Sequence, residues 1–217
     1  PCCRNKGGAS NCRPDLSLAT GCRICTGLLY CAQAASTPHS ALSHAVVEGS
    51  DTVLQFSLLG SGSDGNAAFV SSRQAKILVD NGLSFKQLLA RSAAIGASLE
   101  GLDAVFITHE HGDHVHGVGT LARKLDVPVF ITRGTYESLA PSIGKLPRVE
   151  LFEAGDTIRV KDLEVGSFSI SHDAADPVSF TVASAGAKLG IATDVGHVSQ
   201  LVRHRLSGCH ALVLESN

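Results

Sequence analysis

The sequence predicts an α/β fold in which two β-sheets pack face to face and helices cover their outer faces. From Val53 onward, helix-like and strand-like segments alternate at both ends, whereas strand-like segments follow one another directly in the middle. That arrangement is typical of two packed sheets with helices outside. A length of 217 residues and a hydrophobic content of 44% suffice for one sizeable core. We therefore expect a single domain over residues 53–217.

Strands are predicted where short apolar runs are bounded by turn-forming residues. In chain order, they are residues 53–59, 67–71, 76–80, 103–107, 127–132, 149–152, 157–160, 163–170, 179–183, 189–193 and 211–214. Helices are predicted where apolar residues recur every three or four positions, and Ser84 can cap the first of them. The predicted helices are residues 84–94, 115–125, 135–140 and 199–206.

A glycine-rich segment after the first strand, Gly60-x-Gly62-x-x-Gly65, has the spacing of a dinucleotide-binding motif, and Asp80 follows at the interval that this motif expects. The motif needs a helix directly after the glycines, but residues 66–74 are typical of a strand and a turn. We therefore expect no dinucleotide binding. The loop is instead expected to line the rim of a site through three polar side chains, Ser61, Ser63 and Asn66.

Four potential metal ligands lie within six residues, directly after the strand predicted at 103–107: His109, His111, Asp113 and His114. The chain is still near-extended there, so that His109 and His111, two positions apart, point to the same side. Gly112 then permits a bend that turns the next two ligands toward a second point. Two imidazoles for one ion, and a carboxylate with an imidazole for its neighbour, suit a two-metal hydrolytic site.

The alternative is a polar loop with a chance cluster of histidines, but four ligands at this spacing on a strand end favour the metal site. The pattern differs from the H-E-x-x-H helix of zinc proteases. His116 lies outside the spacing, and we expect it on the exposed face of the next helix. The other histidines are interpreted as surface or packing residues: His39, His44, His197, His204 and His210.

Three more residues stand at or just after the ends of predicted strands: Asp80, His172 and Asp194. Taken singly, Asp80 could be a turn residue, because Asn81-Gly82 follows it. His172 could be an ordinary loop histidine, and Asp194 an ordinary strand-end aspartate. Their order along the chain after the cluster makes His172 and Asp194 candidate ligands.

The cluster and these residues resemble the signature of the metallo-β-lactamase-fold hydrolases. The resemblance is closest to the YycJ/WalJ-type branch, whose members look like phosphodiesterases or exonucleases. It runs from about Val53 to the last residue and implies an αββα four-layer sandwich. It also rests on four segments, which are residues 56–66, 171–178, 193–199 and 215–217.

The resemblance implies a role for each candidate residue. His109, His111 and His172 would hold one divalent metal ion, Asp113 and His114 would hold a second, and Asp194 would bridge the two. Asp113 and Asp194 would be the catalytic residues, and Asp113 would also orient the attacking hydroxide. Asp80 would orient a metal-bound histidine. Zinc is the expected metal, with manganese as the alternative.

Both ends of the chain deviate from that family. Residues 1–52 hold six of the seven cysteines, including Cys22-x-x-Cys25, but neither a zinc site, a disulfide framework nor a secretory signal has its complete pattern there. Since the sequence also contains no Met, we expect residues 1–52 to be a non-native or disordered extension. In the resembled family histidines follow the last segment, so we expect a C-terminally truncated domain with an incomplete second metal site.

These observations predict a hydrolase that cleaves a phosphodiester, in DNA or RNA, through a metal-bound hydroxide. The net charge of −2 provides no global basic field for nucleic acid, but two cations could supply positive charge locally. No apolar run approaches the roughly 20 residues of a membrane helix. We therefore expect a cytoplasmic, bacterial protein without membrane contact and make no prediction of its oligomeric state. The alternatives are hydrolysis of a thioester, lactone or β-lactam on the same fold, or an inactive metal-binding fragment.

Overall fold

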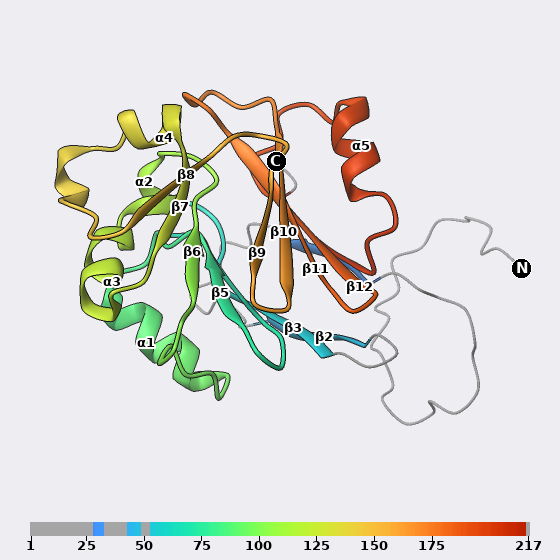
Figure 1. The fold of residues 1–217 in the computed structure, drawn as a ribbon, viewed down its shortest axis with the longest axis horizontal. Coiled ribbons are helices and arrows are strands. Elements are labelled where there is room, and N and C mark those ends of the chain that lie inside the picture. The colour runs from blue at the N-terminus through green and yellow to red at the C-terminus, as the bar shows by residue number, and fades with distance from the viewer. Residues whose placement is uncertain (1–27, 33–42, 49–52, 216–217) are drawn as a thin grey trace, which may run out of the picture.

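A computed structural model describes residues 28–32, 43–48 and 53–215 of the chain. It contains two β-sheets that stack face to face, with helices on both outer faces (Figure 1). This arrangement confirms the predicted αββα sandwich. The helices on one side are α1 (Phe85–Ala94), α2 (Gly112–Val115), α3 (Val118–Leu125) and α4 (Arg133–Glu137), and α5 (Gln200–Leu206) lies on the other.

The first sheet has seven strands in sequence order: β2 (Ser43–Glu48), β3 (Val53–Gly60), β4 (Ala67–Ser71), β5 (Lys76–Val79), β6 (Ala104–Phe106), β7 (Val129–Thr132) and β8 (Val149–Phe152). The first four strands pair antiparallel, and β5 to β8 pair parallel. Parallel pairing directs the ends of β5 and β6 toward the same edge of the sheet, where two of the predicted site segments begin.

The second sheet has six strands in the spatial order β1 (Leu28–Ala32), β13 (Ala211–Glu215), β12 (Ala187–Ala192), β11 (Val178–Ser184), β10 (Leu163–Ser169) and β9 (Thr157–Val160). Strands β9 to β12 pair antiparallel, and β13 runs parallel to both of its neighbours. Strands β10, β12 and β13 therefore end on the same side of this sheet.

The central strand β6 shows why the sequence forms buried layers. Phe106 points into the core between the two sheets, where its ring lies 5.6 Å from that of Phe180. Val105 and Ile107 point the other way, into the core beneath the helices, together with Leu88 and Leu121. Because both faces of β6 are covered, the strand is apolar throughout instead of alternating.

Most predicted elements are present, and the differences have local causes. Ser84 caps α1 as expected, since its side chain accepts a hydrogen bond from the Gln87 N–H. The helix predicted at 115–125 is instead two helices, α2 and α3, interrupted at Gly117. A β-carbon at Gly117 would lie 1.9 Å from the Leu83 carbonyl oxygen, so packing there, and not helical periodicity, sets the chain path. The helix predicted at 135–140 lies earlier, as α4.

The glycine-rich segment is followed by strand β4, as expected, and not by the helix that a dinucleotide site requires. In the predicted extension of residues 1–52, β1 pairs with β13 and β2 pairs with β3. The Cys22-x-x-Cys25 pair lies outside the described residues. Whether residues 1–52 are non-native stays a prediction.

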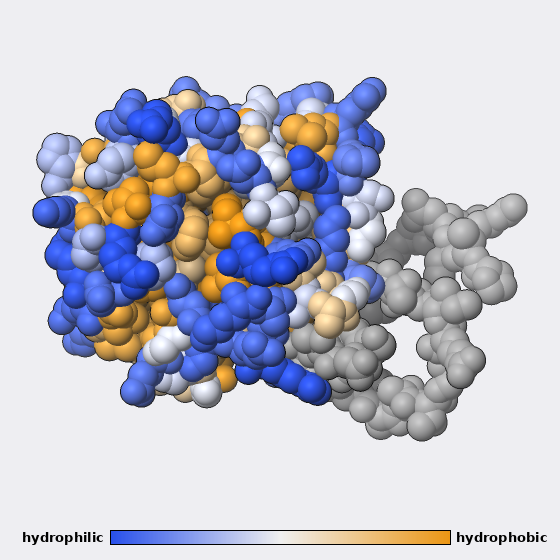
Figure 2. Space-filling view, viewed as in Figure 1, coloured by the Kyte–Doolittle hydropathy of each residue, from blue (hydrophilic) through white to orange (hydrophobic). Residues whose placement is uncertain are grey.

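The exposed large apolar side chains of the described residues are spread over several elements. Large apolar side chains are exposed on separate elements, namely Leu89, Tyr136, Leu151, Val198 and Leu201. On the face seen in Figure 2, hydrophilic side chains surround apolar ones that show between the β8 and β9 sides of the sandwich. Scattered exposure of this kind is ordinary for a folded protein. Within the described residues, no helix is long and apolar enough to span a membrane.

Candidate metal centre

The predicted site residues gather at one end of the sandwich, where strands of both sheets end. Asp80 follows β5, and the motif loop, residues 108–114, follows β6. His172 follows β10, and Asp194 follows β12. Residues separated by more than 100 positions in the sequence thus meet because four strands end on the same side.

Three histidines form the first group. The Nε2 atom of His109 lies 3.1 Å from Nδ1 of His111, and Nε2 of His172 lies 3.2 Å from the same Nδ1 atom. All three ligand nitrogens lie within 4.8 Å of one another. Nitrogens bound to zinc at about 2.0–2.1 Å in tetrahedral geometry are roughly 3.3–3.4 Å apart, so the observed spacing suits one divalent ion.

A hydrogen-bond chain fixes the protonation of His109. The Thr108 hydroxyl lies 2.7 Å from Asp80 Oδ2 and 3.0 Å from His109 Nδ1. A carboxylate only accepts, so the single hydroxyl proton goes to Asp80, and the hydroxyl oxygen accepts from His109 Nδ1–H. Burial, and then the charge of His114, lower the pKa of His109 to about 4. His109 is therefore neutral near pH 7, and its unprotonated Nε2 faces the other two histidines.

A second group contains His109, His114 and Asp194. His114 is fully buried and lies between two carboxylates, with Nδ1 2.8 Å from Asp80 Oδ2 and Nε2 3.1 Å from Asp194 Oδ2. Burial alone would lower the pKa of His114, but the charges and hydrogen bonds of Asp80 and Asp194 raise it to about 10. A cation held by Nε2 and Asp194 would take the place of the Nε2 proton, which is the usual exchange at metal-binding histidines.

Asp80 and Asp194 also share an unusual backbone conformation. Their φ angles are 60° and 57°, in the left-handed region that non-glycine residues seldom adopt. Asp80 is held there by its side chain, which accepts the Thr108 N–H at 2.8 Å in addition to the contacts above. Strained residues of this kind tend to cluster at functional sites. Asp80 thus lies directly against a candidate ligand, His114.

Asp113 is the other residue that the sequence predicted, with His114, for the second ion. It belongs to neither group of three, and its Oδ2 atom lies 3.5 Å from His114 Nε2. The same oxygen accepts a hydrogen bond from the Asn66 side chain at 3.2 Å. Asn66 is buried and its Nδ2 atom also lies 3.0 Å from His114 Nε2, so it sits within the site and not on its rim.

The other two rim candidates, Ser61 and Ser63, are exposed on the glycine-rich loop. Ser61 lines a cavity of about 20 Å³ beneath the site, together with Asn66, Asp80, Thr193 and Glu215. A volume of this order holds about one water molecule. Burial, and then the charge of Asp194, raise the pKa of Glu215. Thr108 and Glu215 were not predicted as site residues, although Glu215 begins one of the segments that carry the family resemblance.

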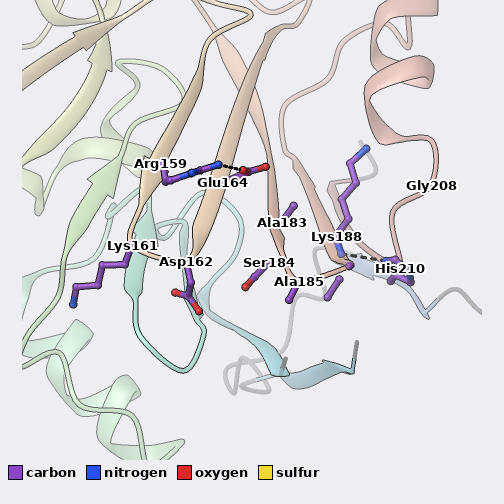
Figure 3. Close-up of a pocket in the computed structure, with 12 residues that line it drawn as sticks. Arg159, Lys161, Asp162, Glu164, Ala183, Ser184, Ala185, Lys188, Gly208 and His210 are labelled. Atoms are coloured by element: carbon purple, nitrogen blue, oxygen red, sulfur yellow. Dashed lines mark hydrogen bonds and ion pairs between the residues drawn. The ribbon is translucent and has the colours of Figure 1, made fainter. Parts of the chain in front are cut away.

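A larger cavity of about 520 Å³ lies at the opposite end of the second sheet, between the β9–β10 and β11–β12 turns and the start of β13 (Figure 3). Its cations already have partners: Arg159 pairs with Glu164, Lys161 pairs with Asp103, and Lys188 Nζ donates to backbone carbonyls. The histidine cluster, and not this cavity, is therefore the stronger candidate for a functional site.

Close glycine packing supports the loops that carry the cluster. A β-carbon at Gly82 would lie 1.8 Å from the Asp113 carbonyl oxygen, and Gly82 N–H donates to the Asn66 carbonyl at 2.9 Å. We predict that Gly82→Ala lowers the free energy of unfolding by roughly 1–3 kcal/mol, as overpacking does. Gly112→Ala is the control, since no atom lies within 4 Å of its β-carbon position. Urea denaturation that finds the two variants equally stable would contradict this packing argument.

The fold and the cluster define a metallo-β-lactamase-like protein, and comparison with solved structures agrees. The Rm3 metallo-beta-lactamase has a TM-score of 0.58 at 19% identity, over 73% of this chain and 74% of that one. MEM-A1, a subclass B3 metallo-beta-lactamase from a soil metagenome library, has a TM-score of 0.56 at 19% identity. The match covers 73% of this chain and 75% of that one. At this level of identity the likeness concerns the fold alone.

The chain belongs to the beta-lactamase superfamily, whose domain pattern matches residues 75–217. It is 39% identical to the exodeoxyribonuclease YycJ of Bacillus anthracis over 166 residues, which are 76% of this chain and 63% of that protein. It is 35% identical to the exodeoxyribonuclease WalJ of Streptococcus pneumoniae serotype 2 (strain D39 / NCTC 7466) over 172 residues, which are 77% of this chain and 64% of that protein. The chain thus spans somewhat less than two thirds of the length of these relatives.

Proposed function

We propose that this protein is a metal-dependent phosphodiesterase that acts on nucleic acid. The observation that carries the proposal is the convergence of one ring nitrogen each from His109, His111 and His172 on one point. The names of the two bacterial relatives, both exodeoxyribonucleases, support DNA as the substrate, with RNA as the alternative. A bacterial, cytoplasmic setting is part of the same proposal.

In this proposal His109, His111 and His172 hold the first ion, Asp113 and His114 hold the second, and Asp194 serves both. Zinc suits the three-imidazole group, and manganese is the alternative. When bound, divalent cations acidify water and stabilise the charge that develops on phosphoryl oxygens.

The side chains around the ligands have distinct tasks. Asp80 holds His114 directly and His109 through Thr108, so both rings stay in the orientation that binding requires. Asp113 is partly exposed and is anchored by Asn66, which leaves one carboxylate oxygen available to orient a water molecule and accept its proton.

A substrate panel tests the proposed reaction. The metal-loaded protein is incubated with linear DNA, bis-p-nitrophenyl phosphate, nitrocefin and a glutathione thioester, in parallel with protein stripped by a chelator. We expect metal-dependent release of nucleotides and p-nitrophenol, and no turnover of the other two compounds. Turnover of nitrocefin or the thioester, with both phosphodiesters intact, would assign the site to another hydrolase class on the same fold.

A further inference from the structure

Glu110 lies between two candidate ligands in the motif loop, but its side chain reaches a different segment. Its Oε1 atom accepts a hydrogen bond from the Ala175 backbone N–H at 2.7 Å. Ala175 belongs to the loop of residues 171–177, which carries His172. Glu110 therefore connects the segment that supplies His109 and His111 to the segment that supplies the third ligand.

The two ends of that loop have other anchors. At its start, the Gly196 N–H donates to the Ser171 carbonyl at 2.9 Å. At its end, the hydroxyls of Thr132 and Thr135 donate to the Asp176 carbonyl at 3.0 and 3.2 Å. The middle of the loop, which includes His172, lies between these anchors. In this middle part, the hydrogen bond from Ala175 to the Glu110 carboxylate connects the loop to the motif loop.

The simplest alternative is a surface carboxylate that happens to meet an N–H group. The burial of the second oxygen argues against it. Oε2 of Glu110 is buried and has no hydrogen-bond partner among the described residues. Leaving a carboxylate oxygen without water or a donor is costly, so a purely superficial side chain would turn that oxygen toward solvent.

We propose that Glu110 is a positioning residue that sets the distance between His172 and the His109–His111 pair. The inference rests on the proposed metal centre and adds to it the part that holds the third ligand in place. With the Glu110–Ala175 hydrogen bond intact, the ligand nitrogens of the three histidines are already at binding distance before an ion arrives. Without it, the His172 loop samples other positions, and metal binding must first order the loop.

The test compares zinc affinity, by competition with a chromophoric chelator, in four variants. Glu110→Ala should weaken binding by about 10–100-fold, as loss of a partner that orients a ligand typically does. Glu110→Asp keeps the charge but is too short, and should behave like alanine. Glu110→Gln keeps an oxygen that accepts the Ala175 N–H, and should bind nearly as well as wild type. Asp173→Ala removes the same charge from the exposed surface of the His172 loop and should change little.

Cobalt absorption provides a second readout, because its visible bands report the geometry of the three-nitrogen site. We expect altered bands in the Glu110→Ala and Glu110→Asp proteins and a wild-type spectrum in Glu110→Gln. Wild-type affinity and spectrum in Glu110→Ala would overturn the inference, and so would an equal loss in Asp173→Ala. Failure of the wild-type protein itself to bind zinc or cobalt would overturn the metal centre, and this inference with it.

Discussion

Replacing His109 and His111 together with alanine removes the tightly held ion, and this change should have the largest effect on the protein. Two of the three nitrogens of the first group are lost, and His109 also belongs to the second group. Metal bound only by the folded state stabilises that state by about 4 kcal/mol when free metal exceeds Kd roughly 1,000-fold. The double variant should therefore lose both its metal and the metal-dependent part of its thermal stability.

Elemental analysis and thermal unfolding with and without chelator check this expectation. His116→Ala is the matched control, because His116 lies in the same segment but is exposed and belongs to neither group. It should keep wild-type metal content and the wild-type response to chelator. Unchanged metal stoichiometry in the double variant would rule out the first site as assigned.

The second large effect is expected from Asp194→Asn. The Asp194 carboxylate pairs with His114 Nε2, and the hydrogen bond from His114 holds the pKa of Asp194 below its usual range although burial opposes this. A neutral amide cannot bridge two cations or balance their charge as a carboxylate does. Hydrolysis should fall by at least roughly 100-fold, more than loss of an outer partner causes, while the three-histidine group keeps its ion.

Phosphodiester turnover and metal content are measured together for this variant. Asp173→Asn is a suitable comparison, since it makes the same chemical change on an exposed loop near the site. If Asp194→Asn binds two ions and turns over at the wild-type rate, Asp194 is not the bridging residue.

The sequence singled out the candidate ligands of the motif loop together with His172 and Asp194, but it did not show the contacts that hold these segments together. The spacing of His109, His111 and His114 is local, and a strand end followed by Gly112 suffices to bring them together. The cap at Ser84 is likewise decided within four residues. By contrast, the break between α2 and α3 at Gly117 follows from its close contact with Leu83, and the spacing of apolar residues in the sequence does not show that contact.

The positions of Asp113 and Asn66 illustrate the same limit. As neighbours in sequence, Asp113 and His114 were expected to share an ion. Asp113 Oδ2 lies 3.5 Å from His114 Nε2, and the same oxygen also accepts a hydrogen bond from Asn66, which stands 47 residues earlier in the chain. The hydrogen bond from Thr108 to Asp80 joins residues 28 positions apart, and the one from Ala175 to Glu110 joins residues 65 positions apart. Such pairs become visible only when strands that are distant in the sequence lie side by side in the fold.

The most direct measurement is nucleotide release from linear DNA by protein that has been stripped of metal and then reloaded stepwise with zinc or manganese. We expect no release from the stripped protein, release that rises with the amount of bound ion, and none from the protein that lacks His109 and His111. If the reloaded wild-type protein binds its metal but leaves DNA and bis-p-nitrophenyl phosphate intact, the proposed function is contradicted and the site is a metal-binding centre without this activity.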